Sequence, residues 1–213
     1  MLIMRFKILF KAFTLFALFV LLPLPAYAQQ GQIRFVLISP CQWAGWPGWN
    51  FFSFCLEPQN TSILNVTAPI YDSIDYILRW NSSAQAYELY SKYSSNNPYD
   101  DFNINESYFI HFISAKNLSV TGQARGDLNL SLVKLWNAPT YPYEFSTNVT
   151  KYLLTIDGFN YMLKWNPQTQ SYLLYSIYSS LNPFSQIYPA EGQFIYINAT
   201  NATLYYNRTY LRG

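Results

Sequence analysis

Residues 76–91 read YILRWNSSAQAYELYS, and residues 161–176 read YMLKWNPQTQSYLLYS. The second stretch follows the first by 85 positions, and both keep the tryptophan, the glutamine and the final Leu-Tyr-Ser at the same places. Asn97-Pro98 and Phe109-Ile110 also recur at this offset. The sequence therefore predicts a tandem duplication, with units near residues 32–123 and 127–211.

Apolar side chains alternate within each copy of this stretch. Tyr76, Leu78 and Trp80 fall on one side of an extended chain, and Ile77 and Arg79 fall on the other. The second copy repeats the pattern. Asn-containing segments that are typical of turns follow both tryptophans. Each unit is therefore expected to contain a β-hairpin whose first strand ends in tryptophan.

Further short apolar runs bounded by turn residues fill the rest of both units. Six or seven strands in about 85 residues indicate a small β-sandwich or barrel. We predict an all-β fold of two tandem immunoglobulin-like or pilin-like sandwich units. One larger sandwich built from both halves is the alternative, because the linker at residues 122–126 is short. The further strands are expected at residues 33–38, 50–55, 62–67, 107–113, 117–121, 128–134, 141–146, 152–156, 193–198 and 203–206.

Residues 1–28 have the parts of a secretory signal peptide. A basic start precedes an apolar run at residues 12–22, and Ala-Tyr-Ala ends at Ala28, where we expect cleavage. An uncleaved membrane anchor is the alternative, but Pro23 and Pro25 before the small residues favour removal. The mature protein is expected to be secreted and to lie outside the cell or on its surface.

Removal of the signal peptide leaves ten Lys and Arg against 11 Asp and Glu, a net charge of −1. Nucleic acid is an unexpected partner, because phosphate binding needs clustered cations and these are scattered. Charged residues form only 11% of the chain. With so few carboxylates, little stability depends on ionisation near pH ~4, which suits an acidic or hot exterior.

The chain contains ten N-x-S/T sequons, whereas roughly two to three are expected by chance. We therefore expect N-linked glycans on several of them. Glycans on these sites would make the surface hydrophilic in place of charged side chains. The ten asparagines are Asn60, Asn65, Asn81, Asn105, Asn117, Asn129, Asn148, Asn198, Asn201 and Asn207.

Cys41 and Cys55 are the chain's two cysteines, and in an exported protein they are expected to form a disulfide. Closing a loop of about 15 residues stabilises by roughly 3 kcal/mol in the chain-entropy model. The alternative of a catalytic thiol has only His111 as a histidine partner.

The residues offer no convincing catalytic set. His111 has no second histidine with which to bind a metal. Asp100 and Asp101 are adjacent, so they would point to opposite faces of a strand; a solvated loop is expected, with weak calcium binding as the alternative. Glu88 aligns with Leu173, which removes a symmetric acid/base pair. We expect a non-enzymatic protein that holds no metal and no small-molecule cofactor.

Residues 29–40, QQGQIRFVLISP, form a short apolar segment at the mature N-terminus. Ile33, Phe35 and Leu37 share one face, and proline ends the segment. Such a strand can add to an open sheet edge of a neighbouring molecule, giving backbone hydrogen bonds and filling its pockets.

The second unit offers an alternative for this segment. Leu128, Leu130 and Leu132 stand at the corresponding place in unit two. Residues 33–38 are therefore either a donated strand or the first strand of their own unit, and the two look identical in sequence.

A signal peptide, an alternating N-terminal strand, all-β units, dense sequons and a charge-poor Tyr/Asn/Ser-rich body together resemble archaeal thread pilins. That resemblance implies head-to-tail filaments joined by donor-strand complementation and coated with N-linked glycans. Its partners would be other copies of itself or related surface subunits. The duplication departs from a simple pilin, so a cap, a tip adhesin or an accessory surface protein is also open.

A binding module is the second functional hypothesis. Trp43, Trp46 and Trp49 lie in the stretch CQWAGWPGW, within the ring that the disulfide would close. No such loop occurs in unit two, which makes it a candidate for contact with glycans or another surface protein. Capping the end of the sandwich is the alternative.

Tyrosines at the end of each hairpin offer a further surface. Tyr90 and Tyr93, with Tyr175 and Tyr178 in the second copy, can form a sugar-stacking platform. We favour core and cross-strand packing for them.

Overall fold

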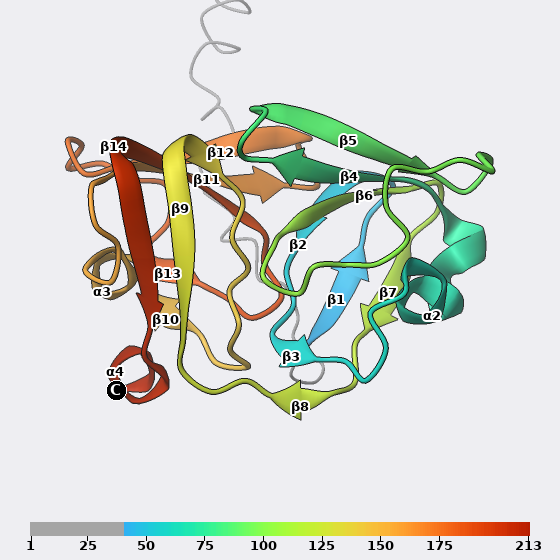
Figure 1. The fold of residues 1–213 in the computed structure, drawn as a ribbon, viewed down its shortest axis with the longest axis horizontal. Coiled ribbons are helices and arrows are strands. Elements are labelled where there is room, and N and C mark those ends of the chain that lie inside the picture. Colours follow the sequence, from blue (N-terminus) through green and yellow to red (C-terminus); the bar gives the residue numbers. More distant parts are fainter. Residues whose placement is uncertain (1–40) are drawn as a thin grey trace, which may run out of the picture. The chain divides into compact units, whose positions relative to one another are not determined.

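The computed structural model describes residues 41–213, which belong to one compact unit, Arg34–Gly213. The signal peptide expected at residues 1–28 and the donor strand expected at residues 29–40 lie outside the described residues. Within residues 41–213, no helix is both long enough and apolar enough to cross a membrane. This part of the chain is all-β, as predicted, with antiparallel sheets and a few short helices (Figure 1).

The first repeat, residues 41–126, contains eight strands and two short helical segments. They are β1 (Gln42–Gly45), β2 (Gly48–Phe52), β3 (Leu56–Glu57), α2 (Ile63–Thr67), the 3₁₀ helix η1 (Ala68–Ser73), β4 (Ile74–Asn81), β5 (Ala86–Ser91), β6 (Tyr108–Phe112), β7 (Lys116–Ser119) and β8 (Gln123–Ala124). Its four-stranded sheet has the order β2-β6-β4-β5, with β1-β7 and β3-β8 as separate pairs.

The second repeat, residues 127–213, contains six strands and two short helices. They are β9 (Leu128–Asn137), β10 (Thr147–Asn148), α3 (Val149–Leu153), β11 (Phe159–Asn166), β12 (Ser171–Ser176), β13 (Gln186–Ile187), β14 (Gln193–Tyr206) and α4 (Arg208–Arg212). The order β9-β14-β11-β12 of its four-stranded sheet matches that of the first repeat strand by strand.

Both predicted hairpins are present with the same register. Tyr76 on β4 lies opposite Ser91 on β5, and Tyr161 on β11 lies opposite Ser176 on β12, 85 positions later in each case. A bulge precedes each tyrosine where the hairpin pairs with β6 or β14. The alternation read from the sequence therefore gives the correct strands and turns.

Three of the predicted strands are wrong. Residues 62–67 and 152–156 were expected to be extended, but α2 and α3 cover most of the first segment and the start of the second. Burial at Ile63, Val66 and Thr67 follows helical spacing, and the side chain of Asn148 caps α3 by accepting from Thr150 N. The third, residues 141–146, has no regular structure, although its tyrosines are buried.

Other boundaries also differ from the predicted ones, and the strand expected at residues 128–134 continues to Asn137. The strand expected at residues 50–55 ends at Phe52. The strands expected at 193–198 and 203–206 are one strand, β14, which has a register shift between Ile197 and Asn201. A single irregularity of this kind lets one long strand serve two pairing segments.

Each repeat has a core of its own on one face of its four-stranded sheet. In the first, β1, β7, α2 and η1 pack over Ile77, which is fully buried, and the disulfide between Cys41 and Cys55 lies in the same cluster. In the second, Met162 occupies the place of Ile77, among four buried tyrosines. The opposite face of each sheet carries the residues that bring the two repeats together.

The place equivalent to Leu128–Leu132 in the first repeat is filled by β1. Trp43 on β1 lies opposite Leu118 on β7, as Leu130 on β9 lies opposite Leu204 on β14. Strands β1 and β2 together thus correspond to the single long strand β9. The counterpart of the leucine strand is β1, and not residues 33–38.

Candidate functional site

The junction between the repeats is the most highly organised feature of the described chain. Trp80 Nε1 donates to the carbonyl oxygen of Trp136 at 3.0 Å, and Gln85 Nε2 donates to the same oxygen at 2.8 Å. Trp136 N donates back to Gln85 Oε1 at 3.1 Å. One carbonyl and one amide of the second repeat are therefore held by a Trp and a Gln of the first.

The same set recurs with the repeats exchanged. Trp165 Nε1 and Gln170 Nε2 donate to the carbonyl oxygen of Trp49 at 2.7 and 3.1 Å, and Trp49 N donates to Gln170 Oε1 at 2.9 Å. Gln85 and Gln170 both have left-handed backbones, with φ of 51° and 50°. This conformation is uncommon for glutamine. The junction is thus isologous, like the interface of a two-fold dimer.

Backbone pairing also crosses the junction twice. Ser107 N donates to Ala138 O at 2.7 Å, and Thr140 N donates to Asn105 O at 2.9 Å, around the bridge pair Glu106 and Pro139. Pro139 fits there because neither flanking bond needs its missing N–H.

Equivalent bonds join the other end of the junction. Gly192 N donates to Phe51 O at 3.0 Å, and Ser53 N donates to Ala190 O at 2.9 Å, around the bridge pair Phe52 and Glu191. Each repeat thus extends a strand into the other.

An aromatic cluster fills the space between the two sheets. Phe51 stacks on Phe109 at a ring-centroid distance of 4.2 Å and on Phe194 at 4.9 Å. Tyr87 and Tyr172 meet beside it through their hydroxyls at 3.1 Å, and burial raises the pKa of both phenols. In Figure 1, the hairpins that carry these tyrosines, β4-β5 and β11-β12, run along the same side of the molecule.

One substitution pair breaks the symmetry of this cluster. Phe51 in the first repeat corresponds to Ala138 in the second, and Gly192 corresponds to Ser107. A Cβ atom on Gly192 would lie 2.6 Å from Cγ of Phe51, so the large ring requires glycine opposite it. At the equivalent contact on the other side of the junction, the small side chain of Ala138 leaves space for Ser107.

A second difference concerns the charged residues. Lys164 Nζ lies 2.5 Å from Glu191 Oε2, and both side chains are almost fully buried. Burial lowers the pKa of Lys164, while the attraction of Glu191 opposes this. At the equivalent place, Arg79 instead pairs with Glu88, and both are partly exposed. Burial raises the pKa of Glu106, the counterpart of Glu191.

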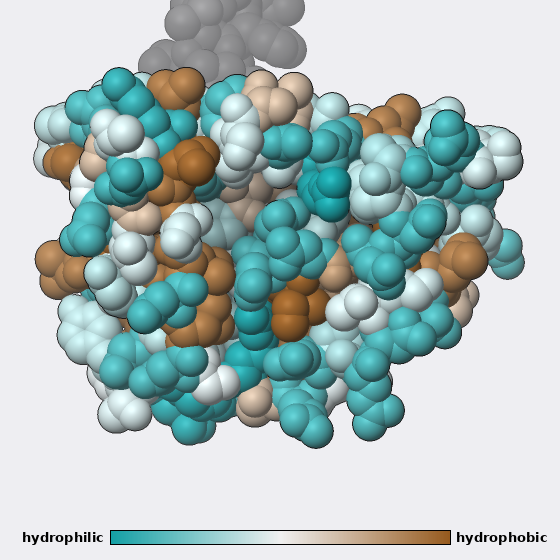
Figure 2. Space-filling model, viewed as in Figure 1, coloured by the Kyte–Doolittle hydropathy of each residue, from teal (hydrophilic) through white to brown (hydrophobic). Residues whose placement is uncertain are grey.

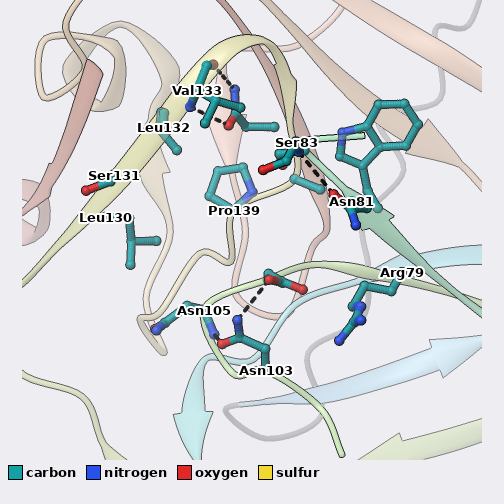
Figure 3. A pocket seen from close by; sticks show the side chains of 15 residues that line it. Arg79, Asn81, Ser83, Asn103, Asn105, Leu130, Ser131, Leu132, Val133 and Pro139 are labelled. Carbon is teal, nitrogen blue, oxygen red and sulfur yellow. Dashed lines mark hydrogen bonds between the residues drawn. The ribbon is translucent and has the colours of Figure 1, made fainter. Parts of the chain in front are cut away.

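A groove of about 430 Å³ opens where the first repeat lacks the buried ion pair (Figure 3). Asn103 Nδ2 donates to Glu106 Oε1 at 2.8 Å within it, and Ala138 and Pro139 line it where Phe51 and Phe52 stand at the equivalent positions. Smaller side chains thus keep this side of the junction open. Its amides and guanidinium can bond to hydroxyl-rich ligands.

The three tryptophans of the disulfide loop point to three different places. Trp43 is 4% exposed and lies in the first core, where it stacks on Phe52. Trp49 belongs to the junction. Trp46 is 44% exposed and lines a shallow hollow together with Lys116. Of the three, Trp46 alone presents a large surface to a partner.

The hairpin tyrosines divide in the same way. Tyr90 is buried and Tyr175 packs against the second core, whereas Tyr93 and Tyr178 are about 70% exposed. His111 Nδ1 lies 2.7 Å from Asp75 Oδ1, and its ring packs against Trp49. No group of three potential metal ligands occurs among residues 41–213.

None of the ten sequon asparagines is buried. The hydroxyl residue two positions later is exposed at six of them, Asn81, Asn117, Asn129, Asn148, Asn198 and Asn207. At Asn65 and Asn105 it is not, because Thr67 and Ser107 are at most 1% exposed and donate to backbone carbonyls.

Exposed apolar side chains gather where sequons are absent. No sequon lies between residues 82 and 104 or between 149 and 197. The first range carries Tyr87, Leu89 and Tyr93, all at least 42% exposed, and the second carries Tyr172, Leu174 and Tyr178 at the equivalent positions. The face in Figure 2, by contrast, is largely hydrophilic, with separated apolar patches.

Comparison of the chain with protein-family models, with characterised proteins and with solved structures finds no match.

The junction was not predicted from the sequence. The repeated Trp and Gln were visible, but alternation alone does not say which face of a strand meets its own core and which meets another repeat. A glutamine kept at the same turn position in both copies was the available signal.

Buried tyrosines predict alkaline unfolding. Burial raises the pKa of these phenols above the ordinary value near 10, so they stabilise the fold below that pH, and this stability is lost as the pH rises toward the folded-state pKa values. We expect tyrosinate absorbance and loss of β-sheet circular dichroism to occur together above pH ~11. Tyrosinate formation well before unfolding would contradict this. The phenols concerned include Tyr99, Tyr108, Tyr141, Tyr152 and Tyr206.

Proposed function

We propose that the mature chain is a non-enzymatic, N-glycosylated structural protein of the cell surface that assembles into filaments. Neighbouring subunits would be linked by donation of the strand at residues 29–40. We also infer that the two repeats arose by duplication of one sandwich-like unit. Its partners are then other copies of the chain or related surface subunits.

One observation carries this proposal. In the first repeat, β1 stands where the leucine strand stands in the second, with Trp43 in the place of Leu130. If residues 33–38 were the first strand of their own repeat, they would occupy the position that β1 fills. On this proposal, the alternating face of Ile33, Phe35 and Leu37 pairs with another molecule.

The sheets offer edges to such a strand. Among the described residues, β5 and β12 each pair with one neighbour and end their sheets. An unpaired strand edge is a template for a further strand. Neither strand carries a predicted glycosylation site of its own, and the nearest on the neighbouring strand β4, Asn81, lies opposite Ala86 at the first residue of β5.

Electron microscopy of the exported protein tests this proposal. The chain with Ile33, Phe35 and Leu37 changed to serine is expected to form no fibres, because the face that fills the pockets is lost. A matched control changes the alternate residues Val36 and Ile38 to serine and is expected to assemble. Fibres from both variants would refute strand donation, and no fibres from the native chain would refute the filament itself.

Adhesion is the second candidate function, and the exposure of Trp46 favours it. Its ring stands beside a hollow lined by small residues and Lys116, an arrangement in which an aromatic ring can stack on a sugar. Trp46→Ala is expected to abolish any signal on a glycan array without changing the fold. Leu154→Ala, at another exposed apolar residue, is the control. Unchanged binding by Trp46→Ala would remove this function.

A further inference from the structure

We propose that the junction also forms between copies of the chain, with the first repeat of one copy paired to the second repeat of the next. This inference rests on the proposed filament and names a surface that joins its subunits. Exchange of this kind is domain swapping, which needs no contact beyond those already in one chain.

The contacts of the junction do not depend on a shared chain. The Trp–Gln sets and the bridge pairs Glu106–Pro139 and Phe52–Glu191 join residues of different repeats, and the aromatic cluster contains residues of both. Residues 121–127 are the covalent connection between the repeats in the described chain. A second copy can supply the same partner groups at the same distances.

The difference between the Phe51–Gly192 contact and the Ala138–Ser107 contact determines which repeats can pair. Pairing two first repeats would place Phe51 against Ser107. Ser107 corresponds to Gly192, where a Cβ would lie 2.6 Å from Cγ of Phe51. Two second repeats would place Ala138 against Gly192 and leave a void. Clash and void both disfavour like pairing. Pairing of unlike repeats is head-to-tail, and a contact of this kind that does not close on itself gives an open filament.

The connection can serve as the hinge. Its strand β8 adds to β3 of the first repeat, while Gly126 has nothing within 4 Å of where a Cβ would stand. Within one chain, a short linker gives the partner repeat an effective concentration of order mM. Isolated chains therefore close on themselves, and exchange requires crowding of the kind found on a cell surface.

A disulfide across the junction tests the proposal. Glu106 and Pro139 form a bridge pair flanked by two hydrogen bonds, the pair type with a Cα separation of about 4.5 Å, which a disulfide can span. Glu106→Cys/Pro139→Cys, oxidised at low concentration, locks the chain closed. Glu106→Ser/Pro139→Ser is the unlocked control, and thermal melting verifies that both fold.

After concentration, the serine control is expected to form fibres and the locked chain to form none. If the cysteine chain is assembled first and oxidised afterwards, non-reducing electrophoresis should give a ladder of covalent oligomers. Fibres from the locked chain, or monomers alone after late oxidation of fibres, would overturn exchange while leaving the filament intact. Absence of fibres from the native chain would instead refute the proposed function, and this inference with it.

A milder pair of variants guards against misfolding of the double mutant. Chains carrying Glu106→Cys alone and Pro139→Cys alone are mixed, concentrated and oxidised. Exchange predicts a disulfide between the two kinds of chain, because residue 106 of one copy then meets residue 139 of another. Each single variant alone is the control. Equal cross-linking in the mixture and in the controls would overturn the proposal.

Discussion

Glu191→Gln is expected to lower the free energy of unfolding by about 3–5 kcal/mol, because it leaves the buried ammonium of Lys164 without its counter-charge. The loss has an upper limit. At pH 7 Lys164 can release its proton instead, at a cost of about 1.36 kcal/mol per pH unit below its ordinary pKa near 10.4. Chemical denaturation at pH 7 measures the effect.

The pH dependence of this variant checks its cause. Burial lowers the pKa of Lys164 in the folded chain and Glu191 opposes this, so Glu191→Gln lowers that pKa further. When the pKa of a lysine is lower in the folded state than in the unfolded state, the free energy of unfolding rises with pH until the unfolded lysine also loses its proton. The deficit of Glu191→Gln relative to the native chain should therefore shrink between pH 7 and 9. A constant deficit would point to lost packing and would contradict this explanation.

The first repeat supplies a matched control. Arg79 and Glu88 form the corresponding ion pair with 27% of each side chain exposed. Exposed pairs contribute about 0.2–1 kcal/mol, so Glu88→Gln should cost about 1 kcal/mol or less. Replacing both Lys164 and Glu191 by methionine should recover most of the stability, because no buried charge then remains.

Phe51→Ala is expected to cost about 3–5 kcal/mol, since it removes the ring on which Phe109 and Phe194 stack. Gly192→Ser should cost about 1–3 kcal/mol by overpacking against that ring. The double variant recreates the Ala/Ser pair of the opposite corner. Its total cost should fall short of the sum by about 1–3 kcal/mol, as measured by a double-mutant cycle.

The recovery will be partial. A Cβ at position 192 would also lie 2.8 Å from the backbone carbon of Phe51, which no change of side chain removes. Ser107→Gly is the control, and it should cost only about 1 kcal/mol for the lost hydrogen bond to the carbonyl of Pro139. Strict additivity of Phe51→Ala and Gly192→Ser would show that the ring and the glycine are not coupled.

The hairpins could be predicted from sequence because their information is local. Alternation, an Asn turn and a terminal Trp fix β4-β5 and β11-β12. The short helices could not be predicted in this way. The segment Ile63–Thr67 is apolar enough for a strand, and only its packing against the core shows that the buried residues have helical spacing. The same limit applies to Leu130 and Trp43, whose equivalence follows from pairing with β14 and β7 rather than from likeness.

The candidate site was harder to predict for a related reason. Trp46 and Trp43 are three positions apart in one loop, yet one is exposed and the other is buried. Which tryptophan is free depends on the core packed beneath the loop. The pairing of Trp80 with Trp136 needed both repeats together, although Trp80 was already visible as one of a recurring pair.

The buried hydroxyls of Thr67 and Ser107 have a consequence for the order of glycosylation and folding. A sugar-transferring enzyme that recognises N-x-S/T must reach the hydroxyl as well as the asparagine. Neither hydroxyl is accessible once the core has formed. Any sugar found on Asn65 or Asn105 must therefore have been attached to the still extended polypeptide, so occupancy at these two positions records whether decoration precedes folding.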